Sequence, residues 1–226
     1  MGYFTRVERT IWCVSVIAII ASFFIFGGDG YLSMIASLVG VSSLLLCAKG
    51  NFFAHILGII FSLIYGYISY TFRYYGEMLT YMCMTMPMAV IALVSWIRNP
   101  YKGKKTQVEI YNINKKDIWW MTVLTISVTV VFYFILSYFN TANLAPSTLS
   151  VGTSFAAVYL TYKRSPYYAV AYAFNDIVLI ILWIMAGLED RKYFSVVVCF
   201  IIFLVNDIYG FMSWKKMESK QSVELD

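Results

Sequence analysis

Two Asn-Asp pairs lie inside long apolar stretches of the sequence, Asn175-Asp176 and Asn206-Asp207. Amides donate and accept hydrogen bonds and carboxylates attract cations, so each pair offers groups that can hold a polar or charged ligand. Asp176 lies near the middle of its apolar stretch, whereas Asp207 lies seven residues before Trp214. The alternative is structural: a hydrogen bond between helices for Asp176, and a bond near a helix end for Asp207. Polar groups at membrane depth are costly and usually face a cavity, which favours the functional interpretation.

Aromatic side chains share helix faces with these pairs. Two neighbouring helical stripes contain Tyr168, Tyr172, Asn175, Asp176, Leu182 and Trp183. Tyr209 similarly lies beside Asp207. Rings stack on a flat ligand, and a carboxylate beside them favours a cation. The alternative, an aromatic belt at the membrane surface, explains Trp214 well and Tyr172 poorly. We therefore predict a binding site for a small flat molecule.

A thinner polar set lies in the first half of the chain and contains His55, Ser62, Tyr65, Tyr81 and Thr85. We assign Tyr81 and Thr85 to the predicted site. Pro87 follows them, and because proline frees a carbonyl inside a helix, it is a candidate hinge. His55 is interpreted as a packing residue rather than a proton carrier.

The sequence carries no motif of common catalytic or cofactor chemistry: no metal-ligand cluster, nucleophile elbow or phosphate-binding loop is found. The four cysteines lie in apolar stretches without CxxC spacing, which predicts reduced, buried thiols. Two aspartates are also found in intramembrane proteases, but the segment Asn-Asp-Ile-Tyr-Gly lacks the Gly-x-Gly-Asp stretch of that family. We expect no enzyme activity, no cofactor and no metal.

The composition places these residues in a membrane protein. Hydrophobic residues make up 61% of the chain, charged residues 13%, and the mean hydropathy is +0.72. A soluble domain has about a quarter charged residues. The alternation typical of a membrane β-barrel is absent, since residues 195–204 read SVVVCFIIFL. The net charge is +5, and the basic residues lie in loops, where they orient a membrane protein. We therefore expect no nucleic-acid partner.

Eight apolar stretches are long enough to cross a bilayer as helices. They lie near Ile11–Phe26, Tyr31–Ala48, Phe52–Phe72, Glu77–Ile97, Asp117–Tyr138, Ala145–Tyr162, Pro166–Gly187 and Tyr193–Trp214. With the N-terminus in the cytoplasm, the outside segments hold only Arg73, Arg191 and Lys192, which leaves 14 of the 17 basic residues inside. This bias supports eight spans with both ends in the cytoplasm.

The spans contain a weak internal repeat. Spans two to four and six to eight each begin with a span rich in small residues and end in Ser-Trp, at Trp96 and Trp214, which are 118 positions apart. Lys49 and Lys163, in the turns after the first span of each set, are 114 apart. The predicted fold is an all-α membrane protein of eight transmembrane helices, with two parallel three-helix repeats joined by a linker helix and one extra N-terminal helix. The predicted segments are 1–30 (N-terminal helix), 31–97 (first repeat), 98–116 (basic cytoplasmic loop), 117–144 (linker helix), 145–214 (second repeat) and 215–226 (cytoplasmic tail).

Together these residues resemble the PnuC family of vitamin-precursor transporters, which is related in fold to the SWEET sugar carriers. The resemblance covers about Leu38 to Trp214. It rests on Ala48-Lys49-Gly50, Leu57-Gly58, Tyr65-Gly66-Tyr67, Tyr75-Gly76-Glu77, Met86-Pro87-Met88, Asn175 with Leu182-Trp183, Leu204-Val205-Asn206, Tyr209-Gly210-Phe211 and Trp214.

The resemblance implies facilitated diffusion of nicotinamide riboside, trapped in the cell by phosphorylation, and often a homotrimer. Asn175 and Asn206 would line the substrate site, with Trp183 and Tyr209 nearby. Where many members have Trp-x-x-Trp-x-x-x-Asn, this chain has Tyr168, Ala171 and Asn175, and a frequent glutamine is Ala89. Relatives carry thiamine, riboflavin or deoxynucleosides, so the substrate is open between these.

The favoured hypothesis is therefore a bacterial cytoplasmic-membrane carrier for nicotinamide riboside, working by alternating access with an intracellular kinase. A second hypothesis is an ion-coupled carrier that uses Asp176 and Asp207, and a third is a membrane enzyme or scaffold without transport. Uptake that responds to an ionophore separates the second from the first. Absence of any vitamin-dependent stabilisation would favour the third.

Overall fold

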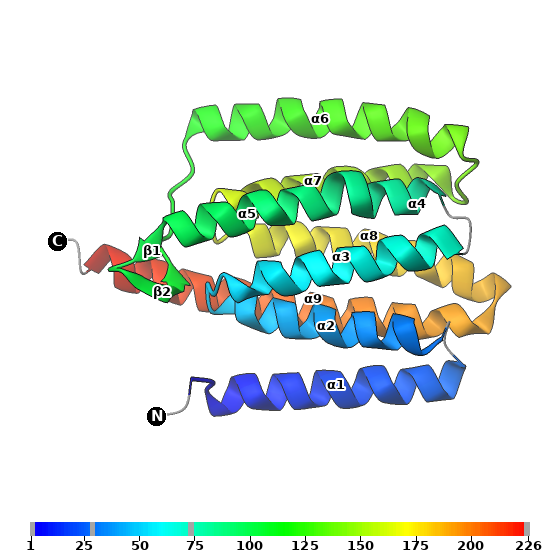
Figure 1. The fold of residues 1–226 in the computed structure, drawn as a ribbon, viewed down its shortest axis with the longest axis horizontal. Coiled ribbons are helices and arrows are strands. Elements are labelled where there is room, and N and C mark those ends of the chain that lie inside the picture. The colour runs from blue at the N-terminus through cyan, green and yellow to red at the C-terminus, as the bar shows by residue number, and fades with distance from the viewer. Residues whose placement is uncertain (1–2, 28–29, 72–74, 224–226) are drawn as a thin grey trace.

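A computed structural model describes residues 3–27, 30–71 and 75–223. Within them the chain forms a bundle of long helices and one small hairpin (Figure 1). The elements are α1 (Arg6–Phe26), α2 (Tyr31–Ala48), α3 (Phe53–Thr71), α4 (Tyr75–Leu79), the π-helix η1 (Thr80–Thr85), α5 (Met86–Arg98), β1 (Pro100–Tyr101), β2 (Lys104–Val108), α6 (Lys115–Tyr138), α7 (Leu144–Tyr162), α8 (Tyr168–Glu189), the 3-10 turn η2 (Arg191–Tyr193) and α9 (Phe194–Val223).

The predicted all-α membrane fold with eight long helices is confirmed, when α4, η1 and α5 are counted as one. Seven of the described helices are long and apolar enough to cross a membrane. The eighth, α7, has 19 residues but carries several serines and threonines, which lower its hydropathy. The predicted end of the third span at Phe72, and Arg73 beyond it, lie outside the described residues.

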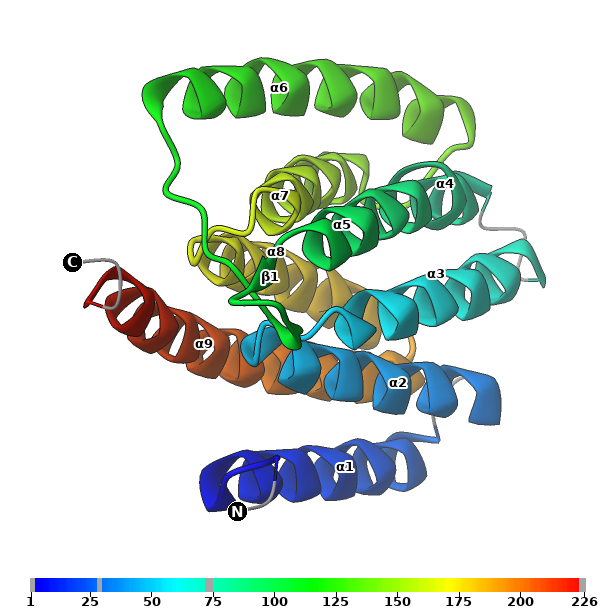
Figure 2. The ribbon, with the colours of Figure 1, turned by 60° about the vertical axis from the view of Figure 1, so that its left-hand side comes forward.

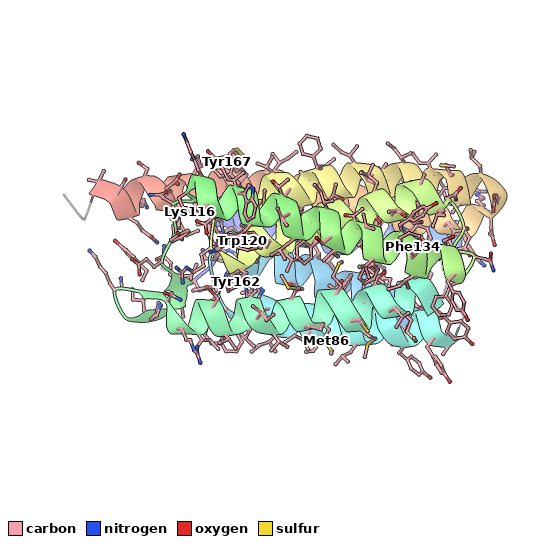
Figure 3. All side chains as sticks on the ribbon, turned by 90° about the horizontal axis from the view of Figure 1, so that it is seen from above. Met86, Lys116, Trp120, Phe134, Tyr162 and Tyr167 are labelled. Carbon is pink, nitrogen blue, oxygen red and sulfur yellow. The ribbon has the colours of Figure 1, made fainter. Side chains whose placement is uncertain are left out.

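Six helices form a closed ring. Going round it, α2 packs on α3, α3 on α5, α5 on α7, α7 on α8, α8 on α9, and α9 on α2 again. The helices α1 and α6 lie outside this ring on opposite sides, α1 against α2 and α9, and α6 against α7 (Figures 1 and 2). The outward face of α6 exposes large apolar side chains such as Trp120 and Phe134, as expected of a surface that faces lipid (Figure 3).

One end of the bundle gathers the basic segments. The start of α1, the end of α9 and the turns at Lys49 and Lys163 all lie at this end, which we call the basic end (Figure 1). Arg191 and Lys192 lie in η2 at the opposite end. The positions of these segments agree with an even number of crossings.

The helices α1 and α6 begin in the same way. Each starts with a capping box, Thr5 with Glu8 in α1 and Asn114 with Asp117 in α6. Each acidic residue then pairs with the lysine of the turn that follows the next helix. Lys49 Nζ lies 3.0 Å from Glu8 Oε2, and Lys163 Nζ lies 2.7 Å from Asp117 Oδ1. These caps explain why both helices start a few residues before the predicted spans.

The pairing with Asp117 also affects the protonation of its lysine. Partial burial lowers the pKa of Lys163, but the hydrogen bond and the charge of Asp117 outweigh this and raise the pKa overall. The ammonium group is therefore held in its charged form at the basic end.

The turns after α2 and α7 have the same backbone hydrogen bonds. Gly50 N donates to Cys47 O at 2.9 Å, and Arg164 N donates to Thr161 O at 3.0 Å. Both residues have a left-handed backbone, with φ of 67° at Gly50 and 58° at Arg164. Together with the caps, this repetition shows that α1 precedes the first repeat as α6 precedes the second.

The two halves also exchange tryptophan hydrogen bonds at the basic end. Trp96 Nε1, at the end of α5, donates to Thr161 O of α7 at 2.8 Å. Trp214 Nε1, in α9, donates to Cys47 O of α2 at 2.8 Å. Each tryptophan thus bonds to the other half, and the rings lie 5.4 Å apart.

The loop predicted over residues 98–116 contains a hairpin that the sequence did not indicate. Strands β1 and β2 pair antiparallel, and Val108 is buried against the Gly50 turn. Val108 N donates to Gly50 O, and Gln221 binds Val108 O and Ile110 N through its side-chain amide. Gln221 lies beyond the predicted end of the last span at Trp214, because α9 continues to Val223 and packs on this loop.

Candidate functional site

The ring of six helices encloses a cavity of about 300 Å³. This volume lies at the lower end of the range for small-molecule sites. The lining residues come from α2, α3, α4 to α5, α7, α8 and α9, and α6 contributes Leu136 at one end. Eight of the predicted site residues line it: Tyr81, Thr85, Tyr168, Tyr172, Asn175, Asp176, Trp183 and Asp207.

Helix α8 presents a continuous stripe to this cavity. Tyr168, Tyr172, Asn175, Asp176, Leu179, Leu182 and Trp183 all line it. The spacing of three and four residues matches one face of a helix, as predicted from the sequence. The rings of Trp183 and Tyr193 lie tilted against each other at a centroid distance of 5.5 Å, and Tyr168 packs edge-on against Trp214 at the other end of the stripe.

Asn175 is held in place by helix α7. The hydroxyl of Thr153 donates to Asn175 Oδ1 at 2.8 Å. The amide nitrogen of Asn175 donates no hydrogen bond to the described residues. The side chain is therefore oriented by its oxygen, and its two N–H groups have no partner in the described part of the chain.

Asp176 and Asp207 bring two carboxyl groups together inside the cavity. Both are only 3% exposed. They come from α8 and α9, the most extensively packed pair of helices, and their side chains lie within hydrogen-bonding reach of each other. Asp176 Oδ2 receives no hydrogen bond from the described protein groups.

Glu77 is a third carboxyl group in this cavity, and the sequence reasoning did not assign it to the site. It lies in the first turn of α4 and lines the cavity together with Ser69. Its position at the predicted start of a span made it look like an interfacial residue. A carboxyl at a predicted span end, four residues before Tyr81, was the signal available in the sequence.

The wall opposite α8 is aromatic. Phe61, Tyr65 and Tyr81 line the cavity, with ring centroids 4.7 Å apart for Phe61 and Tyr65, and 5.2 Å for Tyr65 and Tyr81. Between this wall and α8, Gly58 leaves open space, because a Cβ there would meet no atom within 4 Å. The cavity is thus a slot with rings on both sides.

The lining has an uneven charge balance. Three carboxyl groups line the cavity, from Glu77, Asp176 and Asp207, and His55, the one histidine of the sequence, also lines it. Among the described lining residues there is neither lysine nor arginine. His55 packs edge-on against Trp96 at 4.2 Å. The electrostatics of this cavity therefore favour a cation.

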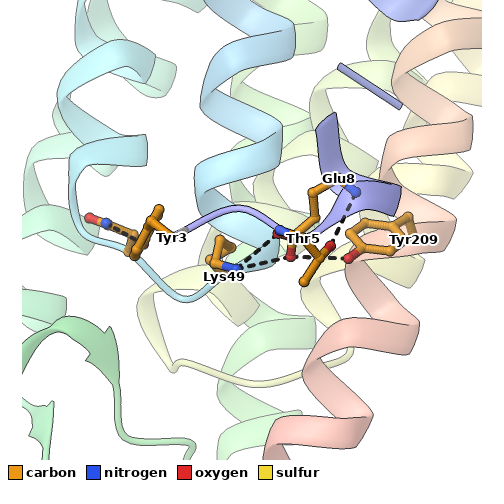
Figure 4. A network of polar contacts seen from close by, with 6 residues as sticks. Tyr3, Thr5, Glu8, Lys49 and Tyr209 are labelled. Carbon is orange, nitrogen blue, oxygen red and sulfur yellow. Dashed lines mark hydrogen bonds and ion pairs between the residues drawn. The ribbon is translucent and has the colours of Figure 1, made fainter. Parts of the chain in front are cut away.

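Asn206 and Tyr209 were predicted to lie in the site, but they face α1 instead. Asn206 Nδ2 donates to Ser15 Oγ at 3.2 Å and to Ile202 O at 2.8 Å. The Tyr209 hydroxyl donates to Glu8 Oε1 at 3.1 Å, in a network that also holds Thr5 and Lys49 (Figure 4). Adjacent residues of a helix point about 100° apart, so Asp207 faces the cavity while Asn206 faces outward.

Pro87 lies just after the π-helix η1, in the first turn of α5. Met86 N donates to Tyr81 O, five residues back, and Thr85 Oγ1 donates to Thr80 O. Proline has no N–H, so the widened turn before it is where the backbone departs from the regular α-helix. Tyr81 and Thr85 both lie in this turn, next to the cavity.

A ring of membrane-length helices around a cavity with polar groups at mid-depth is the architecture of a small-molecule membrane transporter. The model of the nicotinamide mononucleotide transporter family matches residues 30–216. The chain therefore belongs to this family, that of the PnuC transporters, and not to a family of enzymes.

Known relatives agree with this assignment. The chain is 24% identical to a nicotinamide riboside transporter PnuC of Neisseria mucosa, over 98% of this chain and 85% of that protein. It is 23% identical to PnuC of Haemophilus influenzae, over 84% and 81% of the two chains. A crystal structure of the vitamin B3 transporter PnuC shares the fold, with a TM-score of 0.82, 20% identity and coverage of 98% of this chain and 95% of that one.

Proposed function

We propose that this protein takes up nicotinamide riboside, bound in the central cavity. The observation that carries the proposal is the lining: aromatic rings on two sides, one oriented amide and three carboxyl groups, without lysine or arginine among the described lining residues. The nicotinamide ring of the riboside is flat and positively charged, so it suits stacking between rings beside carboxylates. The PnuC proteins of Neisseria mucosa and Haemophilus influenzae are both named for this substrate.

The same lining argues for the riboside over the mononucleotide. A phosphate group needs cationic or N–H donors, most often from arginine or lysine. In this cavity it would meet carboxyl groups instead. Phosphorylation after uptake therefore gives a product that the site rejects, which is the chemistry required for trapping by an intracellular kinase.

We assign separate roles to the lining residues. Tyr172 and Trp183 of α8 face the ring wall of Tyr65 and Tyr81, so the nicotinamide lies between them. The amide of Asn175 and the hydroxyls of Ser150 and Ser154 donate to or accept from the ribose. Asn206 and Tyr209 are left out of this site because they bind groups of α1.

Transport would proceed by rocking of the two repeats, residues 31–97 and 145–214, about the cavity. At the basic end of the described structure four rings pack on one another, those of Trp96, Trp214, Tyr168 and His55. Opening at this end must part these rings, and the widened turn before Pro87 provides a hinge. The carrier lies in the bacterial cytoplasmic membrane with the basic end inside, and forms a homotrimer as the family resemblance implies.

The test is counterflow of labelled nicotinamide riboside in liposomes that contain the purified protein. We expect Asn175→Ala to lower counterflow to the level of empty liposomes, because the variant loses the oriented donor. Asn206→Ala is the matched control: it removes the same group one helix away, at a position that faces α1, and uptake should persist. Wild-type uptake by Asn175→Ala would contradict the proposed site, and absence of counterflow in the wild type would contradict the substrate.

A further inference from the structure

Asp176 and Asp207 form an arrangement that is incomplete without a positive charge. Both carboxyl groups are buried in the cavity and lie within hydrogen-bonding reach of each other. Two carboxylates in contact repel each other, and a hydrogen bond between them requires a proton on one of them. Asp176 Oδ2, turned to no donor of the described protein, marks where that proton or another cation belongs.

The neighbouring groups do not supply this charge. The titratable groups that interact with the pair are Cys47 on α2, Tyr168 and Tyr172 on α8, and Cys199 on α9. From other elements, His55 on α3 and Glu77 on α4 line the same cavity, while α5 and α7 present alanine, valine, serine and threonine to it. Thiols and phenols are neutral at physiological pH. A proton or a bound cation is thus the partner that remains.

We propose that the Asp176–Asp207 pair holds one proton in the empty carrier and releases it when a cationic ring binds. This rests on the proposed function, since the cation is the nicotinamide ring. The charges balance: the pair with one proton carries −1, and the fully ionised pair with one monovalent cation also carries −1. The site therefore exchanges one positive charge for another, so its net charge is the same in the empty and in the loaded carrier.

The linkage has a measurable sign. Where the pair holds its proton, each cation bound displaces about one proton, and affinity for the cation rises by up to about tenfold per pH unit. An uncharged ligand of the same shape displaces none. Dihydronicotinamide riboside, the reduced form of the ring, is such a ligand. Affinity for it should be independent of pH over the same range.

The experiment is calorimetric titration of the full-length protein in detergent with both ligands. Titration at several pH values, in two buffers with different heats of protonation, gives the number of protons released. We expect about one for nicotinamide riboside and none for the dihydro form. Asp207→Asn replaces one carboxyl group of the pair by a neutral amide, so the pair no longer shares a proton. This variant should abolish both the proton release and the pH dependence of the affinity. Asp190→Asn, an exposed carboxyl at the opposite end, should change neither.

The outcomes are distinct. Binding of nicotinamide riboside without proton release, at an affinity independent of pH, overturns the inference and leaves the proposed function standing. Undiminished release in Asp207→Asn overturns the assignment to this pair. If Asp207→Asn does not fold, Asp176→Asn takes its place, and the wild-type buffer comparison needs no variant. If the wild type binds nicotinamide riboside at no pH, the proposed function and the inference both fall.

Discussion

The two halves of this protein, α1 to α5 and α6 to α9, share their scaffold and differ in their chemistry. Each half begins with a capping box, uses the acidic cap residue to hold a lysine, and sends a tryptophan to a carbonyl of the other half. The cavity groups are not repeated. Counting 114 positions back, Asn175 and Asp176 correspond to Phe61 and Ser62, and counting 118 back, Asp207 corresponds to Ala89.

This difference shows which parts of the structure depend on the repeat. Contacts at the basic end hold the halves together, so both halves must satisfy the same geometry there. In the proposed site one ligand would meet both halves at once, so the amide and the carboxyl pair would be needed on one side only. The first half instead supplies the ring wall, Glu77 and the widened turn before Pro87.

The largest effect is expected from making the first half resemble the second at the cavity. Gly58 corresponds to Tyr172, and its missing side chain leaves open space. Gly58→Leu should place a side chain in the slot and reduce uptake to background, while folding is retained because nothing lies within 4 Å of the new Cβ. Counterflow and thermal unfolding measure the two properties. Ile60→Leu, on the exposed face of α3, is the control, and normal uptake by Gly58→Leu would show that substrate does not use this slot.

An intermediate effect should follow when the exchanged tryptophan bonds are removed. Trp96→Phe and Trp214→Phe each remove the side-chain donor from a carbonyl, of Thr161 or Cys47, that keeps its backbone donor in the turn. Each change should lower the free energy of unfolding by about 0.5–1.5 kcal/mol, and by similar amounts. Thermal unfolding in detergent provides the comparison. A large loss for one variant and none for the other would show that the two bonds are not equivalent.

The smallest effect concerns the repeated turn, where Gly50 and Arg164 share a left-handed backbone. Such a backbone suits glycine and costs other residues about 1 kcal/mol. Arg164→Gly removes this cost but also loses the contact of the guanidinium group with the Tyr111 ring. The free energy of unfolding should therefore stay unchanged or rise by up to about 1 kcal/mol. Gly50→Ala should lower it, because its Cβ would lie 3.3 Å from Val108 in a strained turn. The same sign for both variants would contradict this explanation.

Much of this architecture could be predicted because it depends on hydrophobicity and periodicity. The lengths of the apolar stretches predicted the helices, and helical spacing predicted the stripe from Tyr168 to Trp183 that lines the cavity. The placement of Asn206 and Tyr209 could not be predicted in the same way. Adjacent positions of α9 face different neighbours, and only the docking of α1 decides that Asp207 turns inward and Asn206 outward.

Other features were missed because their signals are short or lie outside the spans. The equivalence of α1 and α6 rests on four cap residues and two ion pairs, whereas the sequence suggested an added helix and a linker. The hairpin at Val108 and the extension of α9 to Gln221 stabilise each other, so neither segment predicts the structure alone. Glu77 was missed because a carboxyl at a span end looks like a surface residue.

The exchanged tryptophan hydrogen bonds also bear on how such a chain could arise in evolution. Each half reaches across to complete the other, and neither keeps its own tryptophan for its own carbonyl. A gene that encoded one four-helix unit would thus give a product able to pair with a second copy through the same two bonds. Fusion of two such genes would preserve the pairing, free one copy to lose the amide and the carboxyl pair of the cavity, and leave the other to specialise.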